Sequence, residues 1–247
     1  MNEKIKLVPW DSKVFDRNVF EIEYEKGFSF EDLVKIDNEC KNQNANLSFI
    51  KVDSLDIKTV HNLEKLGFNY IEFQFKIEVG LVKTYELAHY KNFYIKGVRK
   101  EDRLDIKNIC KIAETTFTKD RYSIDPKIGK GLSGKRYKNW VLSSLDDDLY
   151  ELYKYCFKSN DKIAAFLLVK NEGDKIYLAL IGTDSELKGS GIVLSFLIEY
   201  LNTCYSKENK NIYTFISAIN KDIFNIYNLL GFKIIEQSIV LRKVYES

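Results

Sequence analysis

Hydrophobic and polar positions follow two repeating patterns along this chain of 247 residues. Residues 70 to 79 alternate between apolar and polar side chains, which is the pattern of a strand with one buried face. Residues 29 to 43 instead space apolar residues such as Leu33 and Ile36 at helical intervals behind Ser29, a favoured N-cap residue type. The same criteria predict strands over 3–9, 19–25, 46–52, 70–79, 93–98, 151–158, 162–170, 176–182, 211–219 and 233–244, and helices over 29–43, 56–68, 103–117, 135–145, 192–200 and 221–232. Residues 10–18 are expected to form a turn, and 118–136 an irregular loop.

Two segments of the chain resemble each other in the order of their elements. Residues 57 to 78 align with residues 223 to 243 when Gly67 is set on Gly231, and both glycines then stand in a Leu-Gly-Phe sequence. The predicted helix and strand upstream of each segment also correspond. This agreement over several elements predicts an internal duplication.

The two copies differ where chemistry is expected. The first copy lacks the Lys-Gly-Ser-Gly turn at 188–191, and it has Leu63 where the second has Tyr227. We therefore predict a degenerate half-domain over 1–90 with a structural role, and a second domain over 91–247 that carries the functional site.

A glycine-bearing turn connects the strand at 176–182 with the helix that follows it. The first N–H groups of a helix have no intrahelical partner and lie at the positive end of the helix dipole. Glycines let a phosphate approach the backbone, and Lys188 adds a positive charge beside Gly189 and Gly191. The stretch fits an anion-binding site, and it equally fits a plain connection between a strand and a helix.

Charge and hydropathy narrow the class of protein. The 38 basic and 36 acidic side chains give a net charge of +2 without a run of five like charges, so a nucleic-acid partner is not expected. The longest apolar runs have the length of strands, so no association with a membrane is expected. The N-terminus has no apolar segment of signal-peptide type, which predicts a cytoplasmic protein.

Cysteine and histidine usage limits the chemistry further. The four cysteines are Cys40, Cys110, Cys156 and Cys204. They are far apart, form no Cys-x-x-Cys pair and are expected to be buried, reduced thiols. Because His61 and His89 are the only histidines, neither a Ser-His-Asp triad nor a multi-histidine metal site is expected, and we predict no metal.

From residue 93 onward, the predicted elements and two motifs resemble the GNAT (Gcn5-related) N-acetyltransferase superfamily. Residues 186–191 carry both glycines of its acyl-CoA signature Gln/Arg-x-x-Gly-x-Gly/Ala, with Glu186 in place of the first residue. The second signature, Asn-x-x-Ala-x-x-x-Tyr-x-x-x-Gly-Phe, is matched by Asn220, Tyr227, Gly231 and Phe232, with Ile223 in place of alanine. The resemblance implies an α/β fold (mixed α+β), with a central mixed, splayed sheet flanked by helices, and acetyl-CoA as co-substrate.

The resemblance also assigns the residues that contact the co-substrate. The CoA pyrophosphate is expected on the backbone of the turn, at Lys188, Gly189, Ser190, Gly191 and Ile192. The pantetheine amides are expected to pair with the backbone of Ile181, Gly182 and Thr183 like an added strand.

The resemblance assigns a role to Tyr227 and to Asn220, and each residue also has a purely structural interpretation. Tyr227 is expected to face the thioester sulfur and protonate the departing thiolate, and its alternative is a half-buried aromatic of the helix. Asn220 is expected to contact CoA. On physical grounds it is better interpreted as the cap of the helix that begins at Lys221, and both roles are compatible.

A narrower resemblance concerns the acceptor. Trp10-Asp11-Ser12-x-x-Phe15 is similar to the opening motif of the TDP-fucosamine acetyltransferase type of GNAT, although Asp16 follows where that type has a second Phe. The run 121–126, Arg-Tyr-Ser-Ile-Asp-Pro, resembles its acceptor loop.

This narrower resemblance implies a nucleotide-linked amino-dideoxy sugar, such as a dTDP-amino sugar, as acceptor. Arg121, Tyr122 and Asp125 are expected to contact it, and the fork of Arg121 suits a diphosphate. The general base is either water or Asp125. A protein N-terminus, a lysine or a small amine stays open as the acceptor, and so does a non-catalytic CoA-binding module. A homodimer is compatible with the sequence.

Overall fold

The computed structural model describes residues 4–86, 91–128, 131–207 and 211–245. Its strands are β1 (Ile5–Leu7), β2 (Val19–Ile22), β3 (Leu47–Asp53), β4 (Asn69–Gly80), β5 (Phe93–Val98), β6 (Tyr150–Phe157), β7 (Ile163–Glu172), β8 (Lys175–Thr183), β9 (Asn211–Ser217) and β10 (Lys233–Val244). Its helices are α1 (Pro9–Phe15), α2 (Phe30–Asn42), α3 (Ile57–Lys65), α4 (Arg103–Thr116), α5 (Arg121–Ile124), α6 (Leu132–Ser144), the 3₁₀ turn η1 (Ser185–Leu187), α7 (Ile192–Ser206) and α8 (Lys221–Leu229).

The predicted strands and the longer helices are confirmed, and two short helices were missed. The expected cap of α2 is present: the Ser29 side chain accepts from the backbone N–H of Asp32, whose carboxylate accepts in return. The predictions of a turn at 10–18 and of an irregular loop at 118–136 were wrong in part, because α1 forms in the first segment, and α5 and the start of α6 form in the second. Helices of seven and four residues are too short to show a hydrophobic period.

The strands of the described chain form one mixed sheet in the order β1-β2-β3-β10-β4-β9-β8-β7-β6-β5. Two neighbouring pairs are parallel, β2 with β3 and β8 with β9. The pairing of β8 with β9 extends only from Lys175–Asn211 to Tyr177–Tyr213, and beyond Tyr177 the two strands separate. The expectation of a mixed, splayed sheet flanked by helices is confirmed.

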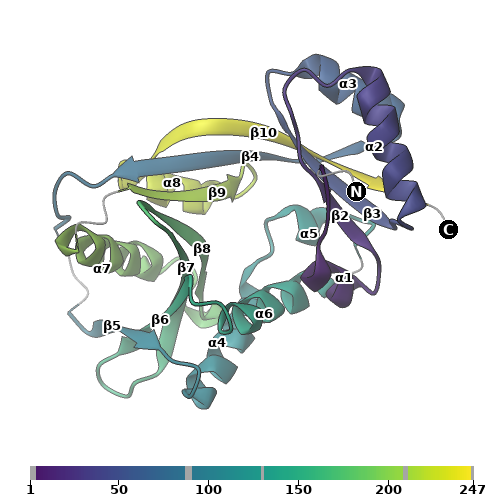
Figure 1. Cartoon of the computed structure of the whole chain (residues 1–247). Helices are drawn as coiled ribbons and strands as arrows, with labels where there is room; N and C mark the ends of the chain where they lie inside the picture. The colour runs from purple at the N-terminus through teal and green to yellow at the C-terminus, as the bar shows by residue number, and fades with distance from the viewer. Residues whose placement is uncertain (1–3, 87–90, 129–130, 208–210, 246–247) are drawn as a thin grey trace.

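The long strands β4 and β10 exchange places between the two ends of the sheet. β4 follows α3 in the chain but pairs with β9, whereas β10 follows α8 but pairs with β3. The two strands also pair with each other, and Figure 1 shows them side by side across the top of the molecule. Each end of the sheet is therefore completed by a strand from the other part of the chain.

Helices cover both faces of the C-terminal strands. Leu167 and Val169 of β7 pack in the core formed with α7 and α8, whereas Phe166 and Leu168 pack in the core formed with α4 and α6. A strand that is buried on both faces explains the nearly continuous apolar run at 162–170. Near the N-terminus, α2 and α3 cover β2 and β3 with a third core that contains Leu33 and Leu63.

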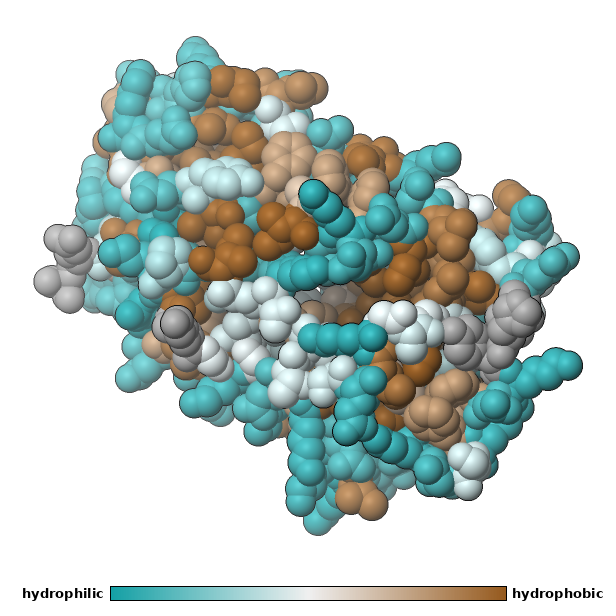
Figure 2. Space-filling model, turned by 180° about the vertical axis from the view of Figure 1, so that it is seen from behind, coloured by the Kyte–Doolittle hydropathy of each residue, from teal (hydrophilic) through white to brown (hydrophobic). Residues whose placement is uncertain are grey.

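The surface mixes hydrophobic and hydrophilic residues. Figure 2 shows the face opposite to that of Figure 1, where hydrophobic areas alternate with hydrophilic ones. Among the described helices, none has the length and apolar character that are needed to cross a bilayer. All four cysteines are buried and free, as expected.

The strand exchange predicts that residues 91–247 do not fold alone. Without β4, strands β9 and β10 would each lose a partner and expose long edges, which favour aggregation. We expect 91–247 expressed alone to be insoluble or to lack a cooperative thermal transition by circular dichroism. Co-expression with 1–86 is expected to restore a soluble complex. A soluble 91–247 fragment with a sharp transition would contradict this dependence.

Candidate active site

A cleft of about 570 Å³ opens where β8 and β9 separate. It extends from the glycine turn before α7, past α8, to the segment that contains α5 and to α6. Its lining includes Ile181, Thr183, Lys188, Gly189, Gly191, Ile192, Thr214, Ser217, Asn220 and Tyr227, together with Lys51, Glu72, Gln74, Arg121, Tyr122, Arg136, Tyr137 and Trp140. A second cavity, of about 710 Å³, lies beside β5 and β6, and no predicted site residue lines it.

The turn before α7 needs its glycines for their backbone conformation. Gly189 has φ +77° and Gly191, at the N-cap position, has φ +82°, and side chains disfavour both values. No atom lies within 4 Å of a Cβ added at Gly189, so conformation and not space requires glycine there. The 15-residue helix α7 therefore begins at the cleft, and the N–H groups of its first turn lie there. Ser190 does not line the cleft, and its hydroxyl donates to the Leu187 carbonyl.

The edge of β8 beyond Tyr177 has no partner strand among the described residues. Ile181 and Thr183 line the cleft, and the Thr183 carbonyl accepts a hydrogen bond from the Thr116 hydroxyl. Gly182 does not line the cleft. A Cβ at Gly182 would approach the Phe166 ring to 2.5 Å, so this glycine permits close packing of β8 on β7.

Tyr227 lies in the cleft wall between the separated strands. Its side chain is almost fully buried, and its ring contacts Phe232 edge to face at a centroid distance of 4.8 Å. Burial raises the pKa of Tyr227 above its usual range, while a hydrogen bond with Thr214 partly offsets the shift. The phenol is therefore protonated near neutral pH and can donate a proton into the cleft.

Asn220 occupies the N-cap position of α8, but its side chain makes no capping hydrogen bond. The interpretation of Asn220 as a side-chain cap was therefore wrong. The residue lines the cleft instead, so its amide is placed to meet a ligand there.

Arg121 and Tyr122 lie at the far end of the cleft in a network of buried charges. Arg121 Nη2 donates to the Tyr122 hydroxyl at 2.7 Å, and its Nη1 lies 3.6 Å from Glu72 Oε1. The Tyr122 hydroxyl donates to Asp11 at 3.3 Å, and Arg136 Nε lies 2.6 Å from the same carboxylate. The guanidinium of Arg136 also stacks on the Tyr122 ring at 3.9 Å.

The two motifs of the narrower resemblance therefore meet in space. Asp11 of α1 pairs with Arg136 of α6, and Phe15 of α1 packs on the Tyr122 ring of α5 at 6.0 Å. Trp10, by contrast, is 52% exposed and lies outside this contact. The N-terminal motif positions α5 and α6 at the far end of the cleft.

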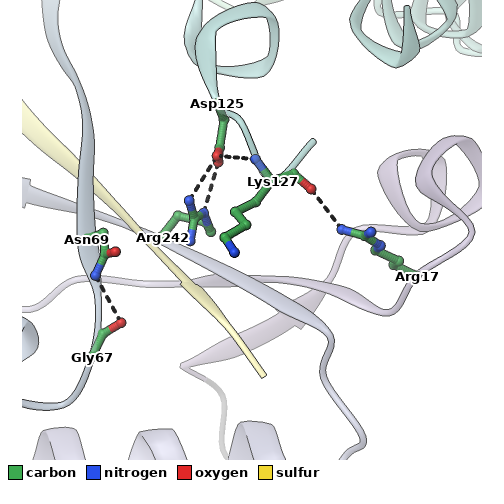
Figure 3. A network of polar contacts seen from close by, with 6 residues as sticks. All are labelled: Arg17, Gly67, Asn69, Asp125, Lys127 and Arg242. Atoms are coloured by element: carbon green, nitrogen blue, oxygen red, sulfur yellow. Dashed lines mark hydrogen bonds and ion pairs between the residues drawn. The ribbon is translucent and has the colours of Figure 1, made fainter. Parts of the chain in front are cut away.

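Asp125 lies outside the cleft. Both of its carboxylate oxygens accept from the Arg242 guanidinium of β10, at 2.8 and 2.9 Å, and its side chain is fully buried (Figure 3). Asp125 also accepts from the backbone N–H of Lys127, whose carbonyl accepts from Arg17. The residue ties the segment after α5 to the sheet, and its carboxylate is not placed to contact an acceptor or to act as a base in the cleft, in contrast to the prediction from the sequence.

Residues 1–90, for which a structural role is predicted, also contribute side chains to the cleft. Lys51 of β3, Glu72 and Gln74 of β4 all line the cleft. Burial, followed by the charge of Arg121, lowers the pKa of Lys51 to about 8. The alternation of apolar and polar residues along 70–79 correctly indicated that β4 has a polar face. That face lies in the cleft only because β4 pairs with β9 and β10.

Replacement of Asp125 is expected to destabilise the protein. Asp125→Ala leaves the buried Arg242 without its carboxylate, and we expect the free energy of unfolding to fall by about 3 kcal/mol in a denaturant titration. The control Asp146→Ala removes an exposed ion pair with Lys100 and is expected to leave the free energy of unfolding nearly unchanged, because water screens the pair. Equal effects of the two variants would contradict the anchoring role.

Replacement of Lys51 is expected to stabilise the protein in a pH-dependent manner. Its folded-state pKa, about 8, lies below its ordinary value of 10.5, so the protonated amine disfavours the folded state below pH 8. Lys51→Met should therefore raise the melting temperature at pH 7, and this gain should fade between about pH 8 and pH 10.5. A gain that does not change with pH would contradict the lowered pKa.

Comparisons with known proteins agree with this architecture. No protein-family model matches the chain. The spore coat polysaccharide biosynthesis protein SpsD of Bacillus subtilis is 20% identical over 232 residues, which cover 90% of this chain and 76% of that protein. A GCN5-related N-acetyltransferase from Sphaerobacter thermophilus superposes with a TM-score of 0.70 at 13% identity, over 97% of this chain and 76% of that one. A tandem GNAT protein from the clavulanic acid biosynthesis pathway gives a TM-score of 0.61 at 10% identity, over 93% of this chain and 76% of its own. The chain therefore has the GNAT fold.

Proposed function

We propose that this protein is an acetyl-CoA-dependent N-acetyltransferase that acts on a primary amine. The observation that carries the proposal is one continuous cleft. It contains the glycine turn at the start of α7, the open edge of β8 and the buried phenol of Tyr227. The GNAT fold of the chain supports the same activity.

The co-substrate fits the turn and the strand edge. Backbone N–H groups at Gly189, Gly191 and Ile192, together with the Lys188 ammonium, provide positive charge for a pyrophosphate, whereas the Lys188 and Ser190 N–H groups donate to carbonyls of the preceding turn. The open edge of β8 around Ile181 provides backbone donors and acceptors for the pantetheine amides, in the manner of an added strand. Asn220, which does not use its side chain as a cap, offers an amide to the same ligand.

Tyr227 supplies the acid of the reaction. Attack of an amine on the thioester forms the carbon–nitrogen bond and expels a thiolate, which needs a proton. Because Tyr227 is protonated at neutral pH and lines the cleft, it can donate that proton.

For the acceptor, we propose a nucleotide-linked amino-dideoxy sugar. The far end of the cleft combines the aromatic rings of Tyr137 and Trp140 with the cations Lys51, Arg121 and Arg136. Aromatic faces suit a base or a sugar ring, and cations suit a diphosphate. The similarity to a spore coat polysaccharide biosynthesis protein supports a sugar acceptor.

We further propose that residues 1–90 are a diverged copy of the acetyltransferase unit. The parallel pair β2–β3 corresponds to the parallel pair β8–β9, and β4 and β10 occupy exchanged positions at the centre of the sheet. In this arrangement the diverged copy retains no glycine turn. It provides one wall of the acceptor site instead.

The activity is tested by a thiol-release assay with acetyl-CoA. We expect turnover with dTDP-4-amino-4,6-dideoxyglucose, and slower or no turnover with polyamines and peptides. If only peptides were acetylated, the proposed sugar acceptor would be wrong and a protein acceptor would take its place. Failure to bind acetyl-CoA in a calorimetric titration would exclude the enzyme activity.

The acid is tested by Tyr227→Phe. We expect kcat to fall about 100-fold while the Kd of acetyl-CoA changes little, because the phenol acts on the leaving group. The control Tyr200→Phe removes another buried phenol, on α7 and outside the cleft lining, and should leave kcat near its original value. Unchanged turnover of Tyr227→Phe would show that another group protonates the thiolate.

A further inference from the structure

Three side-chain oxygens in the cleft are buried without a hydrogen-bond partner in the described part of the chain. They are Glu72 Oε2, Gln74 Oε1 and Ser217 Oγ. Buried polar atoms are nearly always hydrogen-bonded, so three open acceptors in one cleft need an explanation. None of these residues belongs to the two sequence signatures.

The three residues lie together on one face of the sheet. Glu72 and Gln74 are two positions apart on β4 and therefore project to the same side, and Ser217 of β9 pairs directly with Gln74. Directly paired residues place their Cβ atoms about 5 Å apart. We call Glu72, Gln74 and Ser217 the oxygen cluster.

The chemistry of the oxygen cluster selects a cation with several N–H donors. A carboxylate oxygen, an amide oxygen and a hydroxyl oxygen can each accept one hydrogen bond, and a primary ammonium has three N–H groups to donate. Glu72 is only 2% exposed, and an anion beside it would be repelled. Lys51 of β3 and Arg136 of α6 also line the cleft, where they suit the anionic part of an acceptor.

We propose that the oxygen cluster binds the reacting ammonium of the acceptor, and that Glu72 takes its first proton. This inference rests on the proposed acetyl transfer and names the group that prepares the nucleophile. Arg121 Nη1 lies 3.6 Å from the other carboxylate oxygen of Glu72, so Oε2 is the oxygen left open for the ammonium.

The protons of the reaction balance. An ammonium loses two protons when it becomes an amide. The first passes to the Glu72 carboxylate and then to solvent, and the nitrogen lone pair forms the bond to the acetyl carbon. As the carbon–sulfur bond breaks, the Tyr227 phenol protonates the thiolate, and the second nitrogen proton restores the phenol.

The positions of the two groups suit this sequence. On β9, Ser217 and Thr214 are three residues apart, so their side chains lie on opposite faces of the sheet. Tyr227 packs in one core with Ile212 and Ile216, which share the face of Thr214, and the oxygen cluster lies on the other face. The gap between β8 and β9 connects the faces, so the amine and the thiolate meet their partners from opposite sides.

The test compares Glu72→Gln with Glu78→Gln. Glu78 lies on the same strand but outside the cleft lining, where it pairs with Lys175. The acceptors are dTDP-4-amino-4,6-dideoxyglucose and, at high concentration, ethanolamine. We expect Glu72→Gln to lower kcat/KM about 100-fold at pH 7, with the Kd of acetyl-CoA changed less than about twofold. Glu78→Gln should retain wild-type kcat/KM.

The pH profile separates a base from a structural role. Without the carboxylate only the free amine reacts, so the deficit of Glu72→Gln should shrink about tenfold per pH unit up to the pKa of the amine. If the wild type is active and Glu72→Gln stays within about threefold of it, the inference is overturned, and the proposed function stands. A deficit that is equal at every pH also overturns the role as a base. A wild type that acetylates no primary amine overturns both proposals.

Two further variants keep the test decisive if Glu72→Gln does not fold. Ser217→Ala and Gln74→Met each remove one acceptor and leave no charge without a partner. Each is expected to raise the KM of the acceptor about tenfold, because a hydrogen bond to a charged group is lost. An unchanged KM in both variants would overturn the oxygen cluster as the ammonium site.

Discussion

The separation of β8 from β9 after only three paired residues is the constraint on which the rest of the structure depends. If the two strands stayed paired, no cleft would cross the sheet, and the glycine turn and Tyr227 would have no common space. The separation leaves backbone groups of β8 without a partner strand, which is costly unless a ligand or a side chain meets them. The Thr214 hydroxyl meets one of them, the Leu178 carbonyl, at 2.8 Å. The remaining open edge is available to a ligand.

The exchange of β4 and β10 gives the cleft its second wall. Because β4 pairs with β9, the polar face of an N-terminal strand faces the gap next to a C-terminal one. The same exchange aligns Lys51 with Glu72 across the sheet. Val240 of β10 lies between them and pairs with Lys51 of β3 on one side and with Glu72 of β4 on the other. The far end of the cleft is therefore lined by residues of both parts of the chain.

Buried ion pairs fix the elements around the far end of the cleft. Asp125 with Arg242 ties the segment after α5 to β10, and Asp11 with Arg136 ties α1 to α6. Such pairs gain little net stability over apolar packing, since both charges must leave water. Their geometry is directional, however, and here it determines where Arg121 and Tyr122 lie. Arg136 takes part both as the partner of Asp11 and as a stacking surface for Tyr122.

The sequence by itself determined the strands, the longer helices, the glycine turn before α7 and the placement of Tyr227 on a later helix. These features depend on local periodicity, capping and backbone freedom, which neighbouring residues specify. It did not reveal α1 and α5, because helices of seven and four residues carry no period. Only the tertiary structure decided that the Asp125 carboxylate pairs with Arg242 and that Asn220 does not use its side chain as a cap. It also decided that Glu72, Gln74 and Ser217 line one cleft. Those outcomes depend on which strands become neighbours, and the alternation along β4 is the same whether its polar face meets solvent or a ligand.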